Sequence, residues 1–202
     1  MTRIRIAGAA LALAAIGTGI GACDNTGPDD RAFIQVQLTD APADLIESAQ
    51  VWISRVYMMP GEDGEVYDLF NDAANPKSYD LLLLRDGVTA DLTAATAVDP
   101  GNYQQLRIIV DSAFITLAEG YTFNDGSTTR SLKVPSGAET GIKVQLSEPV
   151  EAEPGATTTV VVDFDVEQNF VIQGNPNTPA GINGILFTPV LHEKSRTTSD
   201  EG

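Results

Sequence analysis

The stretch Thr159-Val160-Val161-Val162-Asp163-Phe164-Asp165-Val166 decides the fold class, because two sets of side chains alternate along it. Successive side chains of a β-strand point to opposite faces of the sheet. The set predicted to face the core is Val160, Val162, Phe164 and Val166, and the opposite set is Val161, Asp163 and Asp165. Leu106, Ile108 and Val110 share one face in the same way. The pattern predicts half-buried strands.

Outward from this stretch, short apolar or alternating runs recur from Phe33 to Leu191, and no segment keeps a helical period. Only Ala43–Ser48, after Pro42, favours one or two helical turns. Pairs that tolerate positive φ mark tight turns: Asp63-Gly64, Asp86-Gly87, Asp125-Gly126 and Asn183-Gly184. We therefore predict an all-β fold, an antiparallel β-sandwich of about seven to ten strands with an immunoglobulin-like or transthyretin-like Greek key.

The first 22 residues have the layout of a secretory signal. Arg3 and Arg5 precede an uncharged run, residues 6–22, that is dominated by Ala, Leu, Ile and Gly. This run is shorter than the roughly 20 apolar residues that span a bilayer. It ends in Ile20-Gly21-Ala22-Cys23, which resembles the lipobox of bacterial lipoproteins. We expect cleavage before Cys23, the only cysteine, and anchoring to a membrane through acyl chains, palmitate among them, on its sulfur.

The alternative is ordinary secretion with an incidental cysteine, which would leave a lone thiol in an oxidising compartment. Asp24 resembles the inner-membrane retention signal of enteric lipoproteins, but that rule varies among lineages. The expected location is the cell envelope, with the inner or outer membrane and a periplasmic or surface-exposed position left open.

The chain is strongly acidic, with a formal net charge of −16 that becomes −18 once residues 1–22 are removed. Nucleic-acid binding is disfavoured because phosphate contacts need a clustered basic surface. The expected organisation is a signal peptide (1–22), a lipidated cysteine with a flexible linker (23–32), one β-sandwich domain (33–193) and a disordered tail (194–202).

Several short stretches together resemble domain-of-unknown-function family 4382 (DUF4382) of prokaryotic extracytoplasmic proteins. They occur in the family's order within residues 33–193: Leu38–Asp44 with Pro42, Gly101–Arg107, Pro135-Ser136-Gly137 followed by Gly141-Ile142-Lys143, and Val162–Asp165. The resemblance implies a β-sandwich on a lipoprotein or secreted chain. It implies no established activity.

Carboxylates offer the one candidate metal site. Asp163 and Asp165, about 7 Å apart along a strand, would bind calcium with loop oxygens from the segment that carries Asp40 and Asp44. The favoured alternative is that Arg107 or Lys143 pairs with one of the two strand aspartates, or that both are solvated. Asp40 also suits a turn or helix cap.

Catalytic constellations have little support. His192, the only histidine, is interpreted as a surface or strand-end residue, and the chain lacks the ligands of a usual zinc site. Lys143 is interpreted as an outward-facing strand residue, and Trp52, the only tryptophan, as a core residue. We expect a non-enzymatic binding or structural lipoprotein with a protein or glycan ligand. The alternatives are a carboxylate-based hydrolase of an envelope or extracellular polymer and a calcium-binding protein.

Overall fold

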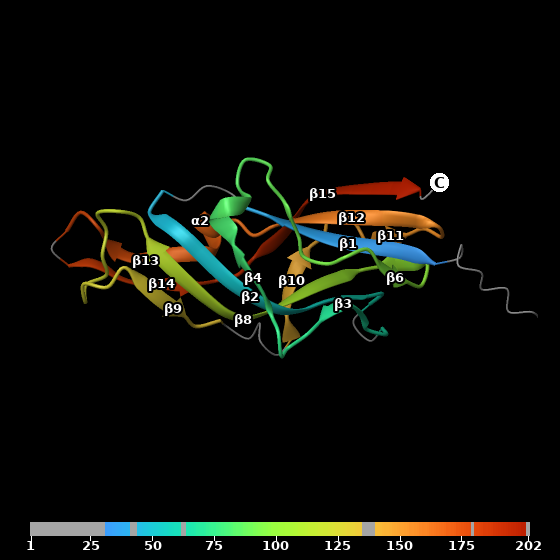
Figure 1. Cartoon of the computed structure of the whole chain (residues 1–202), viewed down its shortest axis with the longest axis horizontal. Helices are drawn as coiled ribbons and strands as arrows, with labels where there is room; N and C mark the ends of the chain where they lie inside the picture. Colours follow the sequence, from blue (N-terminus) through green and yellow to red (C-terminus); the bar gives the residue numbers. More distant parts are fainter. Residues whose placement is uncertain (1–30, 41–43, 62–63, 135–139, 179, 201–202) are drawn as a thin grey trace, which may run out of the picture.

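The computed structural model describes residues 31–40, 44–61, 64–134, 140–178 and 180–200. Nearly all regular structure is β (Figure 1). The strands are β1 (Ala32–Thr39), β2 (Ile46–Met59), β3 (Tyr67–Asn71), β4 (Lys77–Asp80), β5 (Ala90–Asp91), β6 (Thr96–Val98), β7 (Gly101–Tyr103), β8 (Gln105–Leu117), β9 (Thr129–Leu132), β10 (Ile142–Gln145), β11 (Val150–Ala152), β12 (Ala156–Asp163), β13 (Phe170–Asn175), β14 (Gly181–Phe187) and β15 (Leu191–Asp200). The described helices are η2 (Leu81–Leu84), a 3₁₀ turn, and α2 (Val166–Asn169). The predicted all-β class is confirmed.

One curled sheet of eleven strands forms the sandwich-like body, and its main path runs β3-β2-β8-β10-β15-β12-β1-β5. Strands β4, β6 and β9 add to β2, β1 and β8, while β7–β11 and β13–β14 form two small separate pairs. The strands outnumber the predicted seven to ten because several edges are built from short pieces. The sheet is also not purely antiparallel, since β1–β12 and β10–β15 are parallel.

The predicted core face is correct. Val160, Val162, Phe164 and Val166 are fully buried, and so are Leu106, Ile108 and Val110. They share one cluster with apolar side chains from β1, β2 and β8. In β8 the buried set changes from Val110 to Ala113, where shifts in the β2–β8 register mark bulges. A bulge inserts one residue and lets a strand bend, so the long β2–β8 pair keeps its apolar side chains inward as the sheet curls.

The turn predictions were right at two described positions. Asp86 and Gly87 both have positive φ, 58° and 85°. The Gly126 N–H donates to Phe123 O at 2.9 Å, with φ 81° at Gly126. Asn183-Gly184, in contrast, lies inside β14, where the β13–β14 register shifts by one residue. The chain instead reverses direction between β13 and β14 just after Asn175, where the Thr178 N–H donates to Asn175 O at 3.1 Å.

Three other local predictions were wrong. Of the expected helical turn Ala43–Ser48, the part from Ile46 onward belongs to β2, because Ile46 is buried in the strand core. The expected strand Tyr79–Leu84 ends in η2, which Asp80 caps by accepting from Leu82 N–H at 3.2 Å. The expected tail 194–202 is a strand as far as Asp200, because main-chain pairing with β12 needs no apolar side chains.

Candidate functional site

The family-like Leu38–Asp44 segment ends at a junction that β1 and β12 create together. These strands are parallel, and Thr39 of β1 lies opposite Asp163 of β12. The segments that follow them therefore begin side by side at the same end of the sheet. There the Asp40 Oδ1 accepts from the Val166 N–H at 2.8 Å, and Thr39 O accepts from Phe164 N–H at 3.0 Å. Asp40 thus satisfies a backbone N–H group as a capping residue does, but in the helix α2, 126 residues further along the chain, and not in the local turn that the sequence predicted.

Asp163 and Asp165 do not share a strand face. Strand β12 ends at Asp163, and Asp165 adopts a left-handed conformation with φ 42°. Its Oδ1 accepts from the Gln168 N–H at 3.1 Å, so Asp165 is a second cap of α2. The spacing of about 7 Å expected from strand rise therefore does not apply.

The basic partner of Asp163 is Lys194 of β15. The Lys194 Nζ lies 2.9 Å from Asp163 Oδ2, and this hydrogen bond, with the nearby charge, raises the pKa of Lys194. Arg107 and Lys143, the partners suggested by the sequence, lie on β8 and β10 instead and pair with each other as strand neighbours. Across the described ranges, no three His, Cys, Asp or Glu side chains are grouped as a metal site requires. The calcium hypothesis thus gains no support.

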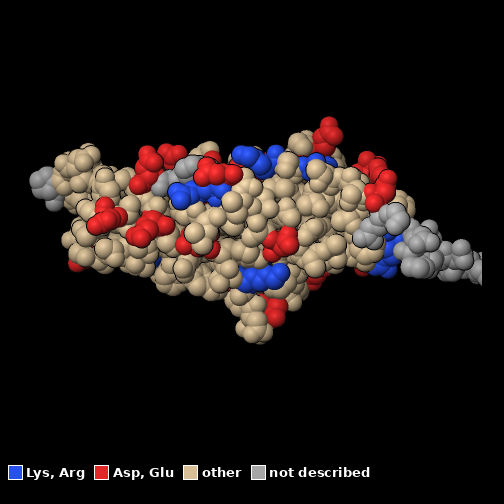
Figure 2. Space-filling view, turned by 45° about the horizontal axis from the view of Figure 1, so that its top comes forward, with Lys and Arg blue, Asp and Glu red and all other residues tan. Residues whose placement is uncertain are grey.

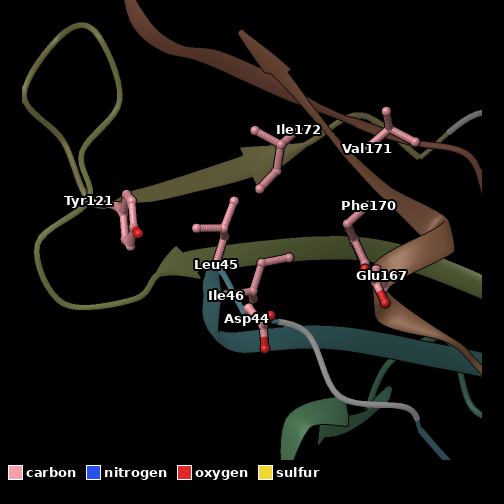
Figure 3. A pocket seen from close by; sticks show the side chains of 8 residues that line it. All are labelled: Asp44, Leu45, Ile46, Tyr121, Glu167, Phe170, Val171 and Ile172. Carbon is pink, nitrogen blue, oxygen red and sulfur yellow. The ribbon is translucent and has the colours of Figure 1, made fainter. Parts of the chain in front are cut away.

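An open pocket of about 520 Å³ lies beside α2 (Figure 3). Ligand sites usually have volumes of roughly 300–1,000 Å³ and mostly apolar walls. Six lining residues are apolar or aromatic and two are acidic: Leu45, Ile46, Tyr121, Phe170, Val171, Ile172, Asp44 and Glu167. In Figure 3 the side chains of Leu45 and Ile172 point toward each other, with Asp44 and Glu167 along one rim. The pocket combines an apolar interior with a negative border.

Three segments that are far apart in sequence build this pocket. The turn before β2 supplies Leu45, and β2 begins at Ile46. The Ala118 N–H donates to Leu45 O at 3.1 Å, which holds the loop of Tyr121 beside this turn. The third wall is the start of β13. There Phe170 stacks on Phe187 with ring centroids 4.7 Å apart, and both rings are buried. The wall at Phe170 is therefore anchored in the core.

The sequence pointed to Asp44 but missed the rest of the pocket. Because Ala43–Ser48 was interpreted as helical, the turn at Leu45 and the start of β2 at Ile46 were not predicted. Tyr121 lies in a loop without a recognisable motif. The one signal available in the sequence was the apolar run Phe170–Ile172 at the start of β13. In the structure its central residue, Val171, is 46% exposed between better-buried neighbours.

The other predicted residues take structural or surface positions. His192 is exposed near the start of β15, and Lys143 points outward on β10, both as predicted. Gly101 begins β7. Trp52 was wrongly placed in the core: its ring meets Phe114 edge-on, with centroids 5.3 Å apart, on the outer face of the β2–β8 pair.

Gly141 has φ 72°, and an added Cβ there would come within 3.3 Å of Arg107 Cβ. The Gly141 turn therefore needs a residue without a side chain. Cys23, Pro42, Pro135 and Gly137 lie outside the described residues.

Acidic side chains are spread over the displayed face, with Lys and Arg between them (Figure 2). In the part of the chain that the structure describes, no helix is long and apolar enough to cross a membrane.

Comparisons with curated proteins and with solved structures found no match. The family model described as a domain of unknown function, DUF4382, matches residues 31–179, which cover the Asp40 junction and β1 through β13. The chain belongs to the DUF4382 family.

Proposed function

We propose that this chain is a cell-envelope lipoprotein whose β domain binds an apolar ligand in the pocket of Leu45, Tyr121 and Phe170 without transforming it. The observation that carries the binding role is the pocket itself, an apolar hollow of about 520 Å³ between β2, the Tyr121 loop and β13. Burial of apolar ligand surface would supply most of the affinity.

Membrane attachment rests on the sequence. Arg3 and Arg5, the apolar run and the Ile20–Cys23 lipobox support export followed by lipidation of Cys23. Cys23→Ser should move the protein from the detergent phase to the aqueous phase on partitioning of native membranes. Retention of the variant in the detergent phase would contradict lipid anchoring.

The ligand site can be tested with a neutral fluorescent probe, N-phenyl-1-naphthylamine. Val171 and Leu186 are cross-strand partners with exposures of 46% and 48%, but only Val171 lines the pocket. Val171→Gln should weaken probe binding several-fold, whereas Leu186→Gln, the matched control, should leave it unchanged. Equal effects of the two substitutions, or no probe binding by the wild type, would contradict the proposed site.

The competing function is hydrolysis of an envelope polymer by a carboxylate pair. Asp44 and Glu167 are the two carboxylates that line this pocket, so they are the pair that such chemistry would use. Turnover of a glycan by the wild type that is lost in Glu167→Gln would favour the hydrolase over the binding protein.

A further inference from the structure

Both charged residues among the described residues that line the pocket are acidic. Asp44 and Glu167 are exposed at its rim, and none of the described residues that line it is Lys, Arg or His. Neither carboxylate takes part in the ion pairs found among the described residues, which join Arg55 to Asp68, Arg130 to Asp125, Lys194 to Asp163 and Arg196 to Glu193. The two charges at the rim are therefore available to a ligand.

At the start of α2, which also borders the pocket, three of the backbone N–H groups that could bind a negative ligand already have acceptors. Two of its N–H groups are already taken, Val166 N–H by Asp40 and Gln168 N–H by Asp165. The Asn169 N–H donates to Asp165 O within the turn. A carboxylate or phosphate in this position would meet Glu167 without a compensating donor from these groups.

We propose that the ligand is a cationic amphiphile, an aliphatic amine whose apolar body lies against Leu45, Phe170 and Ile172 and whose ammonium group lies between Asp44 and Glu167. This inference rests on the proposed function and adds the charge of the ligand to it. The apolar walls select for hydrocarbon, and the two rim carboxylates select for the positive end group. Because the rim is exposed, the selectivity from charge is modest and depends on salt.

The test uses three probes with the same eight-carbon chain: octylamine, octanol and octanoate. Each is titrated against the folded domain loaded with N-phenyl-1-naphthylamine, and displacement of the dye gives its affinity. We expect octylamine to bind about tenfold more tightly than octanoate at low salt, with octanol between them and the differences shrinking as sodium chloride is added.

Matched variants distinguish the effect of the two rim carboxylates on ligand preference from the effect of the overall negative charge of the protein. Asp44→Asn with Glu167→Gln should remove most of the preference for octylamine over octanol. Glu119→Gln, which neutralises an exposed carboxylate in the Tyr121 loop outside this pocket, should retain it.

Each failure has a distinct meaning. Equal affinities for octylamine and octanol in the wild type would overturn the charge inference and leave the apolar site standing. The same preference in the Asp44/Glu167 double variant as in Glu119→Gln would also overturn it, because the preference would then come from the whole surface. Displacement by none of the three probes would overturn both the inference and the proposed site.

Discussion

Asn169, the last residue of α2, is the polar side chain on which the local structure depends most. It is completely buried. Its Oδ1 accepts from the Val190 N–H at 2.7 Å, while Nδ2 donates to Val190 O at 3.1 Å and to Phe164 O. One amide thus joins the end of β12, α2 and the connection between β14 and β15.

Asn169→Ala removes all three hydrogen bonds. Val190 is 41% exposed, so water can replace its two bonds at low cost, but Phe164 is fully buried and its carbonyl would lose its Asn169 partner away from water. A buried polar group without a partner costs about 1–3 kcal/mol, and the re-solvated bonds cost less. We expect the free energy of unfolding to fall by about 3 kcal/mol.

Asn169→Asp keeps the shape but replaces the donor with an acceptor, which then faces the carbonyl oxygens of Phe164 and Val190. At neutral pH it should destabilise the domain at least as much as the alanine variant. Protonation restores one donor, so the pKa of this buried carboxyl should be raised in the folded state, and the loss should shrink as the pH falls.

Urea unfolding measures these differences, with Gln168→Ala as the control because Gln168 is exposed on the same helix. The control should lose no more than about 0.5 kcal/mol. A loss for Asn169→Ala as small as that of the control would refute the reasoning.

Three further changes test other parts of the structure. Gly141→Ala should reduce the free energy of unfolding by about 1–2 kcal/mol, measured by urea titration, because it strains a positive φ and crowds Arg107; an unchanged value would contradict this. Glu193→Gln should cost about 2 kcal/mol at neutral pH. Burial opposes ionisation of Glu193, but its hydrogen bonds lower its pKa below the ordinary 4.5, so wild type and variant should converge in stability as the pH falls below that value. Calcium at matched ionic strength should change the melting temperature equally in wild type and in an Asp163→Asn, Asp165→Asn double variant; loss of the response in the variant alone would support a calcium site.

Sequence reasoning worked where one local pattern determines the outcome. The alternation Val160-Val162-Phe164 determined which face of β12 is buried, since no other arrangement of that strand hides the same side chains. The pattern could not show where the strand ends. Asp165 continues the alternation in the sequence, yet the chain turns there because Asp40 and Asp165 satisfy the N–H groups of α2.

The candidate site depends on contacts that are distant in sequence, and periodicity carries no information about them. The pocket exists because Leu45, Tyr121 and Phe170 converge from three separate segments. The basic partner of Asp163 likewise could not be predicted from the sequence. Lys194 lies in a Ser- and Thr-rich stretch with the composition of a tail, and only its pairing with β12 places it beside the carboxylate.

The position of β15 has a consequence for how the protein folds. This strand follows all the other described strands in the sequence but lies inside the sheet, between β10 and β12. The two parts of the sheet can therefore join only when residues 191–200 are present, and folding should be slow because these pairings are non-local. A shortened chain that stops at residue 179, where the family match ends, would leave β10 and β12 without their shared neighbour. Expression of the domain should accordingly extend to at least Asp200.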